Sequence, residues 1–442
     1  MSDYKPYPAY KDSGVEWLGK VPDGWKVKPL WTVTTVNNDE RDRNIKDLDE
    51  IEYVDISSVT LEYGVSNPTR MLAKDAPSRA QRKAKSGDVV ISTVRTYLRA
   101  IGKVLPEHEA AIFSTGFAIV RSSKEITPSF LYYALLSEYF LSEVEARSNG
   151  ISYPAINASD LLKINIAVPL LEEQIKLTQL LDRETVRIDA LVSKKTRFIE
   201  LLREKRQALI TQAVTRGLDP TVKMKDSGVE WLGEVPEHWE VRTLKYITNF
   251  CGGGTPIRDN LLFWNGDIPW VSPKDMKVEA ICETEENITQ AGLLNSAARL
   301  VPPNQILLVV RSGILKHTIP IAINLIQVAL NQDMRALFFN HNLCIGKFFL
   351  RWVQGFNNDL LQAWRKQGAT VESIEQDYLS DTIIPLPSIA EQQGIVAYLD
   401  HETTRIDSLI TKTQHSINLL KERRAALITA AVTGQIDVRN TA

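Results

Sequence analysis

The most concentrated source of chemistry in this chain is a basic segment, residues 66–104. It holds nine lysines and arginines and two aspartates, a net charge of +7 within a chain whose overall charge is −2. Such a segment attracts phosphate groups, and the attraction weakens as salt concentration rises. A solvated surface or a mobile loop is the alternative interpretation. Its candidate contact residues are Arg82, Lys83, Lys85, Arg95, Tyr97, Arg99 and Lys103.

Arg95, Tyr97 and Arg99 alternate directly after a predicted strand, so their side chains can share one face. Guanidinium forks match the O6 and N7 acceptors of guanine, and an aromatic ring between them can pack on a sugar or a base. Phosphate contact without base recognition and simple surface charge are the alternatives. A second group takes the same position after a strand in the second half of the chain: Arg311, Ser312, Gly313, Lys316 and His317. Further candidates for contact are Tyr153, Asn157, Thr255 and Lys274.

The sequence lacks common catalytic motifs. Its Gly-Lys pairs have neither the following Ser or Thr nor the upstream glycine of a P-loop. There is no Asn/Asp-Pro-Pro-Tyr/Phe tetrapeptide of an amino-methyltransferase and no glycine-rich S-adenosylmethionine loop. The glycine run at 252–254 predicts a turn rather than a phosphate cradle, because no strand-then-helix frame surrounds it. The six histidines and three cysteines show no metal-ligand spacing, so we predict no catalytic site and no metal site in this chain.

Length and composition predict a globular protein of several domains. A chain of 442 residues is long enough for about two to four of them. No apolar run reaches the roughly 20 residues of a membrane span, and the first residues lack a signal-peptide pattern. The cysteines predict reduced thiols, so we expect a cytoplasmic protein with no membrane partner.

An internal repeat defines the elements that must position the candidate residues. Residues 11–34 and 225–248 are identical at 15 of 24 positions, and residues 182–215 and 400–433 are identical at 20 of 34. The inserts between these repeats show little evident likeness. Two similar frames with two different inserts indicate one shared task performed twice, and one variable task performed differently each time.

Each copy of the second repeat predicts a helical stretch of about 45 residues, with a break near Asp182 and near Asp400. Ser388 and Glu391 form a capping-box signature at the second start. Apolar residues recur at steps of three and four, as in an imperfect coiled coil. We predict that the two helices pack antiparallel; two independent helical hairpins are the alternative. The predicted seam residues are Ile188, Leu191, Phe198, Leu202, Leu209, Ile406, Leu409, Ile417, Leu420 and Leu427.

The inserts predict mixed α/β domains. Strands are expected at residues 87–94, 110–120, 305–310 and 329–337, and helices at 128–146 and 343–364. The predicted fold class is therefore mixed α/β (α+β), with two globular domains separated by a long antiparallel two-helix coiled coil in a pseudo-twofold repeat. The predicted domains are 1–165 (first domain with its lead-in), 166–222 (central helical region), 223–384 (second domain) and 385–442 (C-terminal helical region).

Over nearly its whole length the chain resembles the specificity (S) subunit of Type I restriction–modification systems. The lead-in DSGVEWLGxVPxxW, at 12–25 and 226–239, is similar to that family's entry to each recognition domain. PLLEEQ and PSIAEQ resemble its entry to the conserved helices, although Ser388 stands where a fuller Pro-Pro-Leu is often seen. Residues 252–277 and 309–323 look like one type of target-recognition domain, and residues 87–104 and 113–121 look like another.

This resemblance implies a DNA-recognition subunit with no catalysis and no cofactor of its own. Each recognition domain would recognise one half of a bipartite, asymmetric double-stranded DNA target, since a symmetric dimer would demand a palindrome. The helices would dock two copies of a methyltransferase subunit that binds S-adenosylmethionine, and restriction (translocase) subunits would join for cleavage in the prokaryotic cytoplasm. The alternatives are a self-sufficient DNA methyltransferase or nuclease, and a structural coiled-coil scaffold.

Overall fold

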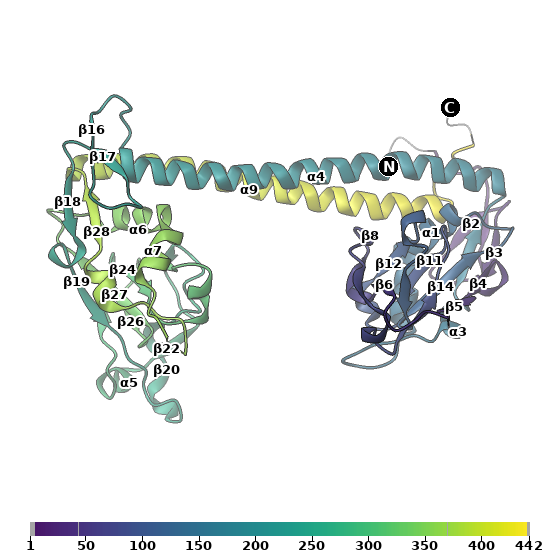
Figure 1. The fold of residues 1–442 in the computed structure, drawn as a ribbon, viewed down its shortest axis with the longest axis horizontal. Helices are drawn as coiled ribbons and strands as arrows, with labels where there is room; N and C mark the ends of the chain where they lie inside the picture. Colours follow the sequence, from purple (N-terminus) through teal and green to yellow (C-terminus); the bar gives the residue numbers. More distant parts are fainter. Residues whose placement is uncertain (1–4, 43, 369, 440–442) are drawn as a thin grey trace. The chain divides into compact units, whose positions relative to one another are not determined.

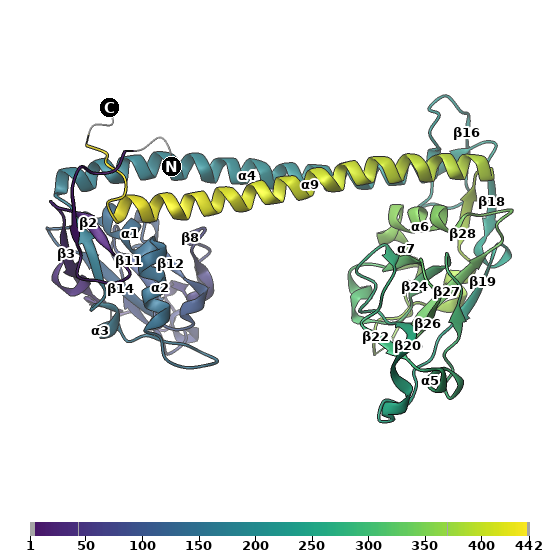
Figure 2. The ribbon, with the colours of Figure 1, turned by 180° about the vertical axis from the view of Figure 1, so that it is seen from behind.

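The computed structural model describes residues 5–42, 44–368 and 370–439. They form two compact units, each built from separate parts of the chain (Figures 1 and 2). Unit 1 combines the chain up to Thr196 with the chain from Gln414 onward, and unit 2 comprises Arg197–Thr413. Each unit therefore contains one insert together with a segment of each long helix. Within the described ranges, no helix is long and apolar enough to cross a membrane.

Unit 1 contains a four-stranded antiparallel sheet with the order β12-β11-β14-β4. Its central strand β11 is buried along its whole length, because both faces of the strand are covered. Val89 and Ile91 face the core beneath α1, whereas Val90 belongs to a second core. The bounds are Thr34–Val36 (β4), Val89–Ser92 (β11), Ile101–Lys103 (β12), Phe117–Ser122 (β14), Pro128–Leu136 (α1) and Glu138–Ala146 (α2).

A second, five-stranded sheet with the order β5-β10-β13-β6-β9 completes the unit 1 insert. Strands β13 and β6 are parallel, and the other neighbours are antiparallel. Phe113 and Phe117 meet edge to face in the core shared by the two sheets, with ring centroids 6.4 Å apart. The bounds are Asp39–Glu40 (β5), Glu50–Val54 (β6), Thr69–Leu72 (β9), Ala80–Lys83 (β10) and Ile112–Ser114 (β13), with the hairpin Val59–Thr60 (β7) and Gly64–Val65 (β8) and the short helix Ala158–Leu161 (α3).

Unit 2 repeats this plan with different side chains. Its sheets have the orders β19-β27-β24-β25-β21 and β22-β20-β26-β23, and β20 and β26 are parallel, as β6 and β13 are in unit 1. The strands are Thr248–Gly252 (β19), Trp264–Val271 (β20), Ala280–Ile281 (β21), Glu286–Ile288 (β22), Leu300–Val301 (β23), Ile306–Val309 (β24), Ile321–Asn324 (β25), Val328–Leu330 (β26) and Met334–Phe339 (β27). The helices are Gln290–Leu294 (α5), Gly346–Gly355 (α6), Asn357–Trp364 (α7) and Gln376–Ser380 (α8).

Four elements predicted from the sequence are each divided in two. Residues 110–120 form β13 and β14, and residues 329–337 fall in β26 and β27. The predicted helix 128–146 is interrupted at Ser137, whose ψ of 141° is extended and whose hydroxyl caps α2. The predicted helix 343–364 is likewise divided into α6 and α7. Polar residues or glycine stand at both strand breaks, Thr115 and Gly116 in the first and residues 331–333 (Asn-Gln-Asp) in the second, and the first helix break falls on a serine, a common capping residue.

The two lead-in repeats fold alike. In unit 1 they form the pairs β1/β2 and β3/β15, and in unit 2 the pairs β16/β17 and β18/β28. Trp25 and Trp239 occupy the same position of the repeat, and each is 1% exposed. The bounds are Tyr10–Asp12 (β1), Lys20–Pro22 (β2), Lys26–Pro29 (β3), Asn165–Val168 (β15), Met224–Asp226 (β16), Glu234–Pro236 (β17), Glu240–Thr243 (β18) and Ile383–Leu386 (β28).

The long helices α4 (Leu171–Arg216) and α9 (Ile389–Val432) are continuous over 46 and 44 residues. The expected breaks near Asp182 and Asp400 are therefore wrong. Ser388 caps α9 by accepting a hydrogen bond from the Glu391 backbone (3.3 Å). The Glu391 side chain bonds Trp239 instead, so only half of the predicted capping box forms.

In each unit a segment of α4 lies antiparallel beside a segment of α9 (Figures 1 and 2). Asp189 and Arg424 form an ion pair at 3.0 Å in unit 1, and Arg206 and Asp407 form one at 3.0 Å in unit 2. Asp407 lies 218 positions after Asp189, and Arg424 lies 218 positions after Arg206. Each unit therefore uses the same pair of repeat positions, with the roles of the two helices exchanged.

Most of the predicted seam residues are shielded from solvent. Seven of the ten residues are buried or partly buried: Ile188, Leu202, Leu209, Ile406, Ile417, Leu420 and Leu427. Leu191, Phe198 and Leu409 are 39%, 45% and 39% exposed. The residues one position later, Val192, Ile199 and Ile410, are less exposed.

Candidate nucleic-acid interface

In unit 1, two loops that are distant in the sequence lie against each other. The strand-exit loop (residues 93–99) follows β11, and the helix-exit loop (residues 147–157) follows α2. Ile156 donates its backbone N–H to the carbonyl oxygen of Thr93 (2.9 Å), and a β-bridge joins the loops at the neighbouring residues. We call this pair of loops the double loop of unit 1.

Arg95 in this double loop is exposed and has no ion pair within the described part of the chain. Its φ of 51° is left-handed. Its guanidinium lies 5.1 Å from the ring centroid of Tyr153, which is 66% exposed. A cation over an aromatic face is held electrostatically, so Tyr153 orients the Arg95 fork while leaving its outer N–H groups accessible. Tyr97 and Asn157 are exposed on the same two loops.

Arg99 has a different environment. Its Nε donates to Glu145 (2.6 Å) and its NH1 donates to Glu138 (2.7 Å). The hydrogen bond to Glu145 is the main cause that raises the pKa of the guanidinium above its ordinary value, although partial burial opposes the rise. Because two carboxylates hold its donors, Arg99 fastens the strand-exit loop to α2. Contact between Arg99 and a nucleic acid stays a prediction, and the geometry favours Arg95 over it.

The other predicted basic residues of unit 1 divide into two kinds. Lys83 donates to a backbone carbonyl (3.1 Å) and Lys103 donates to the Ser129 hydroxyl (3.0 Å). Arg82 has a buried Nε with no hydrogen-bond partner among the described residues, and burial lowers the pKa of its guanidinium. Lys85 is exposed. None of these four residues forms an ion pair within the described ranges, so their charges remain available to an anion.

Unit 2 has the same double loop. Its strand-exit loop (residues 310–317) follows β24, and its helix-exit loop (residues 365–375) follows α7. Ile374 donates its N–H to the carbonyl oxygen of Val310 (2.8 Å), which matches the bond between the loops of unit 1. The two inserts therefore form the same pair of hydrogen-bonded loops from different sequences.

The predicted residues Arg311 and Thr255 of unit 2 belong to one polar network. Arg311 is exposed, but its Nε donates to the Asp333 carboxylate at 2.7 Å. Asp333 follows Gln332 in the turn between β26 and β27, and the Gln332 side chain accepts a hydrogen bond from the Thr255 hydroxyl. The charge of Arg311 is thus neutralised within unit 2.

A cleft of about 630 Å³, which we call the unit 2 cleft, lies beside the strand-exit loop. Ser312 lines it from that loop, and Lys274 and Glu279 line it from the segment after β20. Lys274 is exposed and has no ion pair among the described residues. The structure therefore brings together two predicted contact residues that lie 38 positions apart in the chain.

Three further predicted residues complete the strand-exit loop of unit 2. Lys316 and His317 are exposed and form no ion pair within the described part of the chain. Gly313 has open space where a Cβ atom would stand. This end of the loop is therefore accessible to a large ligand.

The glycine run at 252–254 packs against neighbouring backbone. A Cβ atom on Gly253 would stand 2.1 Å from the Leu330 carbonyl oxygen, and one on Gly254 would stand 2.6 Å from the Ala297 carbonyl carbon. Only glycine permits so close an approach. The run therefore serves close backbone packing. Gly252 is the last residue of β19 and no turn forms at residues 253–254, so the predicted turn is wrong. No cluster of His, Cys, Asp and Glu suited to a metal ion occurs among the described residues.

Sequence reasoning identified Tyr153 and Asn157 in unit 1 but missed the helix-exit loop of unit 2. A signal exists at the 218-residue offset of the second repeat, where three residues of the unit 1 loop recur in unit 2: Arg147, Gly150 and Ile156 as Arg365, Gly368 and Ile374. The two glycines share a positive φ, 111° and 72°. Three identities in eleven positions are too few to identify a loop without its structure.

The long helices carry exposed apolar residues at equivalent repeat positions. Leu191 and Leu409 are each 39% exposed, and Leu201 and Leu419 are 46% and 50% exposed. Each pair is related by the same 218-residue offset. The two helices therefore present exposed leucines at the same repeat positions.

The family model for the Type I restriction modification DNA specificity domain matches the chain twice, over residues 22–200 and 236–419. The specificity subunit of the Type I restriction enzyme EcoR124I/EcoR124II from Escherichia coli is 36% identical over 206 residues, which are 46% of this chain and 48% of that relative. The chain thus spans about half the length of this relative, and matches to specificity subunits from Methanocaldococcus jannaschii and Salmonella potsdam cover 43% and 47% of those proteins.

Two solved structures share the fold. One is described as "Structural basis underlying complex assembly and conformational transition of the type I R-M system". Its matching chain has a TM-score of 0.75 at 22% identity, and the match covers 94% of this chain and 99% of that chain. The HsdS subunit from Thermoanaerobacter tengcongensis has a TM-score of 0.54 at 23% identity, with 94% and 98% covered. At these identities the likeness shows the fold alone, and it confirms the predicted fold class. Because the family model matches once in each half and covers most of the residues, this chain belongs to the Type I restriction modification DNA specificity domain family.

Proposed function

We propose that this chain is the DNA-recognition subunit of a Type I restriction–modification complex, without catalysis of its own. The double loop carries the proposal, because each unit builds it with the same backbone bond and fills it with different side chains. Unit 1 presents Arg95 on the ring of Tyr153, whereas unit 2 presents the cleft lined by Ser312 and Lys274. Proteins distinguish base pairs by the donors and acceptors on their edges, so unlike double loops suit unlike sequences.

Each unit would recognise one half of a bipartite, asymmetric target. Arg95 has the fork that pairs with O6 and N7 of guanine, so we place a guanine contact in the half-site of unit 1. Basic residues without ion pairs position each unit on phosphates and carry no sequence information themselves. They include Arg82 and Lys85 in unit 1, and Lys274 and Lys316 in unit 2.

The long helices would dock two copies of a methyltransferase subunit. Leu191 and Leu201 on α4 have Leu409 and Leu419 as their counterparts on α9, so both helices offer the same apolar contacts. Equivalent surfaces are suited to identical partners. The partner would bind S-adenosylmethionine and methylate adenine N6, restriction (translocase) subunits would join for cleavage, and the complex would act in the prokaryotic cytoplasm.

Mapping of methylated adenines across the genome of a host that carries this chain with its methyltransferase subunit tests the proposal. We expect a single motif with two unlike halves. Exchange of residues 35–165 for those of a relative should change one half and leave the other intact, and the reciprocal exchange of residues 249–384 should do the opposite.

Each alternative has its own outcome in this experiment. A change of both halves after one exchange would contradict separate recognition by the two units. Methyl transfer by the chain alone would identify a self-sufficient methyltransferase, and sequence-specific cleavage by the chain alone would identify a nuclease. Methylation that is independent of this chain would leave it as a structural scaffold.

A further inference from the structure

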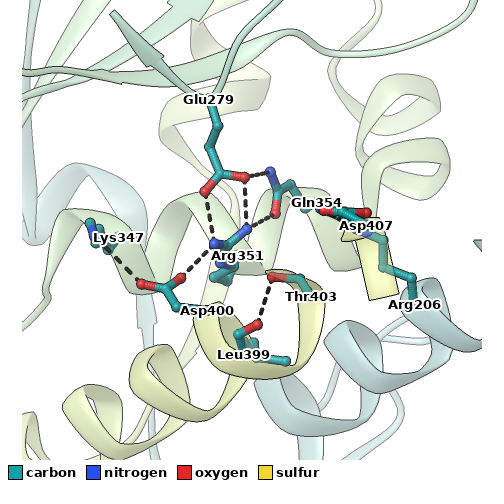
Figure 3. A network of polar contacts seen from close by, with 9 residues as sticks. All are labelled: Arg206, Glu279, Lys347, Arg351, Gln354, Leu399, Asp400, Thr403 and Asp407. Atoms are coloured by element: carbon teal, nitrogen blue, oxygen red, sulfur yellow. Dashed lines mark hydrogen bonds and ion pairs between the residues drawn. The ribbon is translucent and has the colours of Figure 1, made fainter. Parts of the chain in front are cut away.

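A network of ion pairs in unit 2 joins the lining of the cleft to two helices (Figure 3). Its centre is Arg351 on α6, whose side chain is only 6% exposed. The guanidinium lies 2.5 Å from the Asp400 carboxylate on α9 and 2.7 Å from the Glu279 carboxylate. Lys347, one helical turn before Arg351, lies 3.5 Å from Asp400. Asp400 is therefore paired with two cations, Arg351 and Lys347.

Glu279 reaches this network from the lining of the unit 2 cleft. Its side chain is 41% exposed, so its carboxylate adjoins both the cleft and Arg351. Arg351 donates NH1 to Oε2 at 2.8 Å, its NH2 lies 2.7 Å from Oε1, and Gln354 donates to Oε2 at 3.0 Å. Both carboxylate oxygens are engaged. An unpaired carboxylate at this position would repel a phosphate in the cleft, and that repulsion would weaken as salt is added.

Among the described residues, unit 1 makes the equivalent contact with its long helix without a cation. The residue 218 positions before Arg351 is Tyr133, and its hydroxyl donates to Asp182 at 2.6 Å. Asp182 is in turn the counterpart of Asp400 on the other long helix. Both units therefore attach the recognition domain to the same repeat position. A neutral tyrosine is enough to attach the domain in unit 1, so attachment alone does not explain why unit 2 has a cation at this position. The ion pair between Arg351 and Glu279 explains it.

We propose that Arg351 is a positioning residue that masks the charge of Glu279, so that the unit 2 cleft can accept the phosphate backbone of DNA. The inference rests on the proposed function and names the chemistry of the ligand at this place, a phosphodiester group attracted by Lys274. Arg351 itself makes no contact with DNA, because its side chain is almost completely buried. It acts through Glu279, which it holds in place and neutralises.

A charge-rescue experiment tests this role. The full chain, in complex with its methyltransferase subunit, is titrated onto a duplex that contains the mapped target. Arg351→Gln unmasks Glu279 and should weaken binding by roughly tenfold at low salt, the order expected for one added charge in a partly screened cleft. The deficit should shrink as salt concentration rises. Glu279→Gln alone should bind at least as tightly as the unmodified chain.

The double variant Arg351→Gln/Glu279→Gln separates charge from structure. It lacks the ion pair but also lacks the unmasked carboxylate, so we expect affinity within about twofold of the unmodified chain. A double variant as weak as Arg351→Gln would overturn the inference, because a purely structural role cannot be rescued by removing a second partner. Thermal unfolding of each variant, measured in parallel, verifies that the bound species are folded.

A matched control lies in unit 1. Tyr133→Phe removes the equivalent bond to Asp182 without exposing a carboxylate, so it should leave the salt dependence of binding unchanged. A salt-dependent loss in Tyr133→Phe equal to that of Arg351→Gln would overturn the inference. Absence of specific binding by the unmodified complex would instead contradict the proposed function, and the inference would fall with it.

Discussion

Replacement of Arg95 by alanine probes the double loop of unit 1 at its most accessible donor. A bidentate arginine–guanine contact contributes about 1–3 kcal/mol of discrimination, which is roughly 5- to 150-fold in relative affinity. Because Arg95 has no ion pair among the described residues, its loss leaves no carboxylate unpaired within the protein. We therefore expect the full effect in DNA recognition and almost none in stability.

Tyr153 should act through Arg95. The guanidinium lies 5.1 Å from the ring centroid, and an exposed cation–π contact contributes about 0.5–1 kcal/mol. Tyr153→Ala should therefore weaken the half-site of unit 1 by about two- to fivefold, whereas Tyr153→Phe keeps the ring and should bind as the unmodified chain does. In the Arg95→Ala background, Tyr153→Ala should have no further effect, since the residue it orients is gone.

Competition binding with the methyltransferase complex measures these effects. The competitors are the mapped target and duplexes with one base pair changed in the half-site of unit 1. Lys85→Ala is the control, because loss of a phosphate contact weakens all duplexes alike and reduces the salt slope by about one. Equal loss on every duplex for Arg95→Ala would reduce Arg95 to a phosphate contact. Additive effects of the Arg95 and Tyr153 replacements would refute the orienting role of the ring.

Two further predictions concern the frame and the core, and denaturation of the full chain measures both. Asp189→Arg or Arg424→Asp alone places like charges across the helix pair and should cost about 1 kcal/mol, whereas the double exchange restores the pair and most of the stability. Stability of the double exchange no better than either single variant would contradict this pairing. Gly253→Ala should destabilise by about 1–3 kcal/mol, because its Cβ would stand 2.1 Å from a carbonyl oxygen. Gly313→Ala, which meets open space, should change stability by less than about 0.5 kcal/mol, and equal effects of the two would contradict the packing of the glycine run.

The long helices could be predicted because their signal is local and occurs twice. Three- and four-residue steps are contained within a few turns, and the second copy repeats them. Which apolar residues face the partner helix is harder to predict than the helices themselves. At Leu191 and Val192, as at Phe198 and Ile199, two adjacent apolar residues compete for one position. The position of the partner helix determines which residue of each pair is buried, and the local sequence does not specify that position.

The candidate site could be predicted only in outline. Basic residues directly after a β-branched strand marked both strand-exit loops. Which of those cations remains free depends on carboxylates far along the chain: Glu138 and Glu145 neutralise Arg99, and Asp333 neutralises Arg311. Such pairs form only when the chain folds back on itself, so no spacing rule separates Arg95 from Arg99.

Asp182 and Asp400 give each long helix an acceptor for a side chain of the adjoining domain, and that acceptor does not require one particular donor. The Tyr133 hydroxyl donates to Asp182, and the Arg351 guanidinium donates to Asp400. The two side chains have in common only a hydrogen-bond donor and the length to bring it to the helix. A foreign recognition domain could therefore be seated on this frame if it brought any such donor to that place. Recombination could then exchange whole domains without a compensating change in the helices, and a new DNA target would become available in one step.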